Sequence, residues 1–143
     1  MAAIYHNFPI NGSIEKVFEG IATVQGLDNW WSKFSEGKPA IGEIFELSFG
    51  PEYQWSAIVS KYIMNQEFEL TFTVADSDWI HSKVGFELSS MKEVTMVRFY
   101  HSGWNEENEH YKISNYCWAM YLRLLKRFIE AGEVVSYESR LDV

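Results

Sequence analysis

Four histidines and one cysteine are the side chains of this sequence best suited to metal, nucleophilic or acid–base chemistry. His6, His81, His101 and His110 are dispersed, and no His-x-x-x-His or Cys-x-x-Cys spacing occurs, so no zinc site is predicted. Cys117 with His101 would make a nucleophile–base pair. The favoured interpretation is a thiol that packs as a small hydrophobe and a histidine bonded to backbone. No glycine-rich phosphate loop and no Gly-x-Ser-x-Gly motif is present.

His101 is the strongest polar candidate for a binding pocket. It alternates in phase with Val97 and Phe99, so the three side chains should share the inner face of a strand. A polar group in apolar surroundings needs a hydrogen-bond partner. A ligand oxygen or the hydroxyl of Tyr116 or Tyr121 would serve.

A long C-terminal helix over residues 105–131 must position these groups. Asn105 or Asn108 can cap its start, and Gly132 follows its last turn. Apolar residues recur at spacings of three and four positions, and they cover roughly two thirds of the helix circumference. Such a helix needs a concave partner. Its two apolar stripes are Ile113, Cys117, Met120, Leu124 and Phe128, and Trp118, Leu122, Leu125 and Ile129.

Short alternating segments in the rest of the chain predict the sheet that supplies this partner. A strand over 4–10 precedes a short helix capped by Ser13, and a second helical piece covers 27–31. A loop is expected over 35–42. Five strands joined by tight turns then imply an antiparallel meander and an α+β fold. They are expected over 44–49, 53–63, 68–74, 82–90 and 94–102.

The composition excludes several classes of partner. The 143 residues suit one domain over 1–143, with 133–143 as a tail. A net charge of −8 argues against nucleic acid as a partner.

The single cysteine fits a reducing cytoplasm, and neither a secretory signal nor a membrane span is apparent. Aromatic residues at 17% exceed what a minimal core requires and indicate an aromatic-lined cavity.

The chain resembles the helix-grip fold of the START and birch-pollen-allergen-like (SRPBCC) superfamily, in the branch of homologues of the activator of the heat-shock-protein ATPase. The matching stretches are Gly26 to Trp31, Gly42 to Phe45, Val84 to Leu88, Val97 to Trp104, and Tyr116 to Trp118. The resemblance implies a deep cavity between the sheet and the long helix, often suited to lipids, sterols or polyketides. Cys117, where a glycine often precedes the tryptophan, and the bulky stretch from Trp79 to Ser82 depart from the commoner pattern.

We therefore predict binding of a small apolar or amphipathic molecule, with no cofactor and no metal. An enzyme acting on a bound hydrophobic substrate is one alternative. The other is a protein-interaction module of co-chaperone type that contacts its partner through Trp104, Tyr53 or the tail. Self-association through exposed apolar edges is left open by the sequence. The expected ligand-binding residues are Trp31, Trp55, Phe72, Trp79, Phe86, Phe99, His101, Tyr116, Cys117, Met120, Tyr121 and Leu124.

Overall fold

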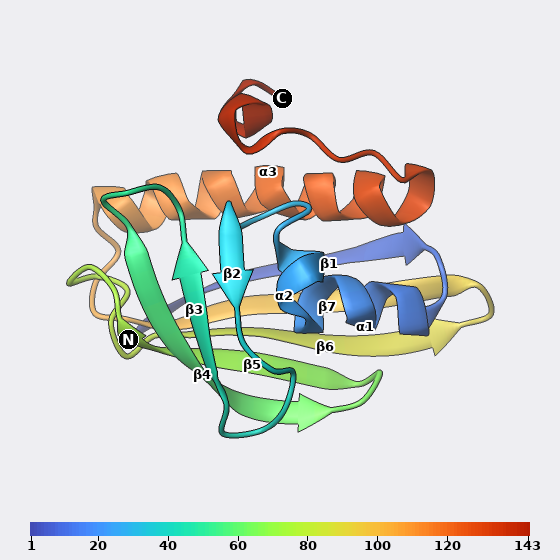
Figure 1. Cartoon of the computed structure of the whole chain (residues 1–143), viewed down its shortest axis with the longest axis horizontal. Coiled ribbons are helices and arrows are strands. Elements are labelled where there is room, and N and C mark those ends of the chain that lie inside the picture. The colour runs from blue at the N-terminus through green and yellow to red at the C-terminus, as the bar shows by residue number, and fades with distance from the viewer.

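A computed structural model describes residues 1–143 and shows one curved antiparallel sheet with a long helix across one face (Figure 1). The strand order is β1-β7-β6-β5-β4-β3-β2, and every neighbouring pair is antiparallel. This is the α+β helix-grip arrangement. The elements are β1 (Ala2–Asn11), α1 (Ile14–Ala22), α2 (Val24–Leu27), β2 (Phe34–Glu36), β3 (Ile44–Ser48), β4 (Gln54–Ile63), β5 (Glu67–Val74), β6 (Lys83–Met91), β7 (Val94–Trp104), α3 (Glu109–Ala131) and the 3-10 helix η1 (Tyr137–Asp142).

Helix α3 begins and ends as its sequence predicts. The Asn108 side chain accepts a hydrogen bond from the backbone N–H of Tyr111, and Gly132 ends the helix with φ 68°. The buried face is narrower than expected, because the sheet covers only one side of the helix. It consists of Ser114, Trp118, Leu122, Leu124 and Leu125, whereas Ile113 is 56% exposed. The sequence places apolar residues over roughly two thirds of the circumference, and only part of that arc is buried.

Two local elements also differ from the sequence prediction. The expected loop over 35–42 begins with strand β2, where Ser35 pairs with Leu47 of β3. The second helix lies earlier, at Val24–Leu27, so the two tryptophans that follow lie in a turn. Helix α2 packs closely on α1, since a Cβ at Gly26 would lie 2.3 Å from the Glu19 carbonyl oxygen.

The last eleven residues return across α3 and end in η1 (Figure 1). Arg140 anchors this C-terminal segment and is only 3% exposed. Its guanidinium donates to the carbonyl oxygens of Asp28 (2.7 Å), Ser32 (3.0 Å) and Val135 (3.0 Å). The segment is thus fastened to the turn after α2 through backbone carbonyls.

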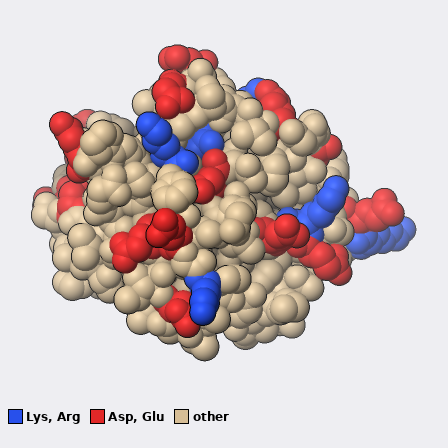
Figure 2. All heavy atoms as spheres, in the orientation of Figure 1, with Lys and Arg blue, Asp and Glu red and all other residues tan.

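Charged side chains are spread over the surface, and acidic ones are the more numerous on the face in Figure 2. No basic tract crosses that face, in keeping with a net charge of −8. None of the helices combines the length and the apolar character needed to cross a membrane.

Candidate functional site

A group of aromatic rings fills the space between the sheet and the N-terminal half of α3. The His101 ring lies 4.4 Å from Trp79 and 4.9 Å from Trp104, measured between ring centroids. Trp118 descends from α3 to contact Phe99 at 4.6 Å. We call these rings the aromatic cluster, and its members are Trp31, Trp55, Phe72, Trp79, Phe99, His101, Trp104 and Trp118.

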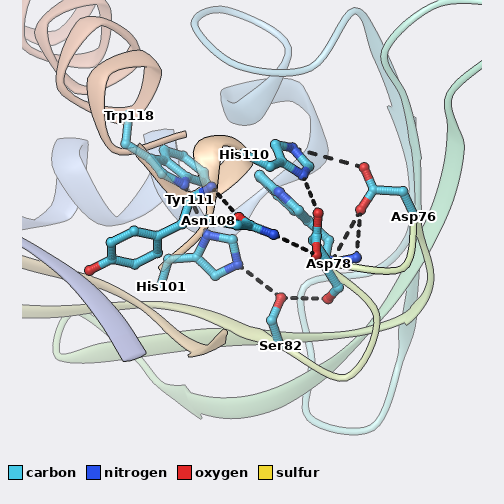
Figure 3. A network of polar contacts seen from close by, with 9 residues as sticks. Asp76, Asp78, Ser82, His101, Asn108, His110, Tyr111 and Trp118 are labelled. Carbon is cyan, nitrogen blue, oxygen red and sulfur yellow. Dashed lines mark hydrogen bonds and ion pairs between the residues drawn. The ribbon is translucent and has the colours of Figure 1, made fainter. Parts of the chain in front are cut away.

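His101 is held at both ring nitrogens by protein groups (Figure 3). The Trp118 indole N–H donates to Nδ1 over 3.0 Å, so the proton of a neutral ring lies on Nε2. Nε2 donates to Ser82 Oγ over 2.8 Å, and that hydroxyl donates to the Trp79 carbonyl oxygen over 2.5 Å. Ser82 and Trp118 therefore satisfy His101, in place of the tyrosine hydroxyl that the sequence suggested.

Burial also fixes the charge of His101. Desolvation by burial, with a smaller electrostatic contribution from His110, lowers the pKa of His101 to about 3. The ring is neutral at physiological pH. Burial raises the pKa of the Cys117 thiol. A nucleophile–base pair of these two residues has no support, because both His101 nitrogens are already engaged and the thiol is not activated.

Two buried donors of the aromatic cluster have no partner. The indole N–H groups of Trp79 and Trp104 are buried and make no hydrogen bond. Trp79 is 7% exposed and Trp104 is 1% exposed. Their ring centroids lie 6.2 Å apart, with His101 close to both. A buried donor without an acceptor costs about 1–3 kcal/mol, so these two N–H groups are unused hydrogen-bonding capacity within the cluster.

A polar contact closes the outer rim of the aromatic cluster (Figure 3). His110 Nδ1 lies 2.9 Å from Asp78 Oδ2, and its Nε2 lies 4.0 Å from Asp76 Oδ2. Asn108 donates to Asp78 Oδ1 over 3.3 Å. The hydrogen bond with His110 holds the pKa of Asp78 below its ordinary value. These contacts join the start of α3 to the β5–β6 loop that carries Trp79.

The expected ligand-binding residues fall into three groups. Six belong to the aromatic cluster, and Phe86 packs on Phe99 at 5.3 Å. Leu124 belongs to the buried face of α3, and Cys117 and Tyr121 are partly buried beside it. Burial raises the pKa of Tyr121 to about 12. Tyr116 is 79% exposed and lines a hollow on the outer side of α3 with Met120. Tyr116 and Met120 are therefore separated from the other members.

The deep open cavity implied by the resemblance is closed in this structure. Five hollows of about 230 to 770 Å³ lie along the molecular surface, and none of the five is lined by a ring of the aromatic cluster. The tryptophans of the aromatic cluster occupy the interior at this end of the sheet instead, and four of them, Trp31, Trp79, Trp104 and Trp118, are buried. Trp79 was among the predicted site residues, whereas Trp104, Trp118 and Ser82 were not. Nothing in their spacing indicates that all three contact His101.

A family profile described as "Activator of Hsp90 ATPase homolog 1-like protein" matches residues 11–130. The chain belongs to this family. The family comparison supports a domain of ligand-binding or co-chaperone type and leaves the individual ligand or partner open. None of the curated protein sequences matches the chain.

Solved structures extend the family comparison to the whole fold. The Aha1 dimer from Colwellia psychrerythraea is similar with a TM-score of 0.83 and 28% identity, over 93% of this chain and 99% of that chain. A protein from Mesorhizobium loti has a TM-score of 0.81 at 19% identity, over 93% and 100% of the two chains. CalU16 from Micromonospora echinospora has a TM-score of 0.76 at 16% identity, over 98% and 81%. The last two share the fold alone.

Proposed function

We propose that the protein binds a small, uncharged aromatic or amphipathic molecule within the aromatic cluster. The observation that carries this proposal is the pair of unpartnered indole N–H groups of Trp79 and Trp104. A ligand oxygen that accepts from them would remove the cost of two buried, unsatisfied donors. The surrounding rings would hold the apolar part of the ligand.

The polarity of the cluster favours an uncharged ligand. His101 is neutral, and both its nitrogens are bonded within the protein. At the rim, Asp78 and Asp76 contact His110, so these side chains already have partners within the protein. An ionised ligand would lose its hydration without gaining a counter-charge.

Entry of the ligand requires the rings to separate, because they are packed against one another. The β5–β6 loop is the element best placed to move. It carries Trp79, and the polar contacts of Asp78 with His110 and Asn108 tie it to α3 at a partly exposed rim. Exposed polar contacts of this kind open at low cost.

A matched pair of probes tests the acceptor site. Tetralone and tetralin share a fused ring system, but only tetralone carries a carbonyl oxygen. We expect tetralone to shift the indole ¹H–¹⁵N signals of Trp79 and Trp104 and to bind about tenfold more tightly than tetralin. Trp104→Phe should reduce that preference.

Trp30→Phe is the control, because the Trp30 indole N–H is already bonded to the Gly20 carbonyl oxygen at 2.9 Å. This variant should keep the preference for tetralone. The proposal fails if tetralone and tetralin bind equally, or if neither of the two indole signals responds.

A protein-interaction role is the second candidate, favoured by the 28% identical relative that was solved as a dimer and by the family description. Tyr53 is 49% exposed and available for contact, whereas Trp104, which the sequence suggested, is buried. Sedimentation of the purified chain, alone and with an Hsp90 chaperone, tests this role. A single monomeric species in both runs would count against it.

A further inference from the structure

A second candidate site lies on the opposite, solvent-facing side of α3. A hollow of about 450 Å³ runs between this helix and the end of the C-terminal segment. One wall is made by Tyr116 and Met120 of α3, and the other by Leu141 and Val143. The volume falls within the range of small-molecule sites.

The apolar walls of this hollow are unusually open to solvent. Tyr116 is 79% exposed, Leu141 is 69% exposed and Val143 is 53% exposed. The second wall is nevertheless fixed in place, because Arg140 next to Leu141 is buried and donates to three carbonyl oxygens. An ordered segment therefore holds apolar side chains against water instead of burying them in the core.

A cation without a protein partner lies beside these walls. Lys126 contacts Glu130 over 2.5 Å, and Arg127 is bonded to Glu133. Arg123 makes no hydrogen bond or ion pair, although it lines this hollow and a neighbouring one of about 330 Å³ between β1 and α3. Arg123, Lys126, Arg127 and Glu130 all line this hollow, so cations outnumber anions there in a chain whose net charge is −8.

We propose that this outer hollow binds an amphipathic anion with a carboxylate head and an alkyl chain. The carboxylate pairs with the Arg123 guanidinium, whose planar donors suit a carboxylate. The alkyl chain covers Met120, Tyr116 and Leu141 and removes their apolar surface from water. This site is separate from the aromatic cluster and does not depend on the function proposed for it.

Decanoate and 1-decanol, below their aggregation concentrations, are the probes. We expect decanoate to shift the methyl signals of Met120, Leu141 and Val143 in the full-length protein, and to bind about tenfold more tightly than decanol. Arg123→Gln should remove most of that difference. Lys112→Gln is the matched control, since Lys112 lies on the same helix, does not line the hollow and pairs only with Glu109.

Four results would overturn the proposal. Two concern affinity: decanoate binds equally to wild type and Arg123→Gln, or does not bind at millimolar concentration. The third is that decanoate shifts only the Trp79 and Trp104 indole signals. The fourth is a dimer, detected by sedimentation, whose interface covers the hollow and blocks decanoate. Because tetralone and decanoate report on different residues, failure at one site is distinguishable from failure at the other.

Discussion

The two faces of α3 treat polar groups in opposite ways. On the inner face, Trp118 joins His101 and Ser82 in a chain of hydrogen bonds, and only two indole donors remain unused. On the outer face, Arg123 has no protein partner and apolar side chains lie open to water. One helix thus separates an uncharged interior with spare donors from a surface hollow with a spare cation.

The two candidate sites differ less in the size of the hollow than in the polar groups that the protein leaves without a partner. On the inner face aromatic rings fill the space, so only the indole donors without an acceptor indicate which ligand group could bind. On the outer face a hollow is open, and the unpaired guanidinium of Arg123 indicates that an anionic group could bind there. Substitution of a polar group that has a partner within the protein should therefore cost stability, whereas substitution of an unpartnered group should change ligand binding instead.

The largest difference should appear between two tryptophans of the aromatic cluster. Trp118→Phe removes the donor to His101 Nδ1 and leaves a buried acceptor unpaired, whereas Trp104→Phe breaks no hydrogen bond. We expect Trp118→Phe to destabilise the protein by about 2 kcal/mol more than Trp104→Phe. Urea unfolding of the two variants measures this. Equal losses would show that the His101 bond contributes nothing.

Acidification should weaken the folded state through His101. Its pKa is about 3 when folded and 6.5 in the reference state, so below pH 6.5 the unfolded chain takes up a proton that the folded chain refuses. Stability is therefore complete above pH 6.5 and declines toward pH 3. Between pH 7 and pH 5 we expect a loss of about 2 kcal/mol.

The same measurement on His101→Gln provides the control for that prediction. This variant lacks the titrating ring, so its stability should change less than that of wild type over the same interval. If both proteins show the same pH dependence, His101 is not the group responsible.

The C-terminal segment should respond to Arg140 without affecting the aromatic cluster. Arg140→Ala removes three hydrogen bonds to carbonyl oxygens and should cost about 2 kcal/mol locally. Amide exchange should accelerate in residues 133–143 and remain slow in β7. Accelerated exchange in both regions would mean that the segment is part of the cooperative core.

The smallest effect on stability is expected at Arg123. Because it is exposed and unpaired, Arg123→Gln should unfold within about 0.5 kcal/mol of wild type. A larger loss in thermal or urea unfolding would assign Arg123 a structural role, and the contrast between the two faces would disappear.

Sequence periodicity predicted the scaffold well, because strands and helix caps depend on local signals. The alternation of Val97, Phe99 and His101 placed all three on the inner face, as observed. Asn108 caps the start of α3 and Gly132 ends it, as their residue types predict. Strand β2 was missed because three residues that pair with β3 carry too short a pattern to be recognised.

The site was harder to predict, because its contacts join residues far apart in the chain. Ser82, just before β6, contacts His101 of β7, and Arg140 donates to Asp28, 112 positions away in the chain. Periodicity also cannot show which apolar stripe of a helix lacks a covering layer, which is why Tyr116 and Met120 were grouped with interior residues. The three-dimensional arrangement supplied both facts.

Native mass spectrometry of the purified protein, before and after solvent extraction, tests the central claim most directly. The account predicts an added mass that extraction removes, that Arg123→Gln retains, and that a Trp79→Phe/Trp104→Phe double variant lacks. The claim would be contradicted by an unliganded mass in a protein that also takes up no tetralone, or by an added mass that the double variant retains.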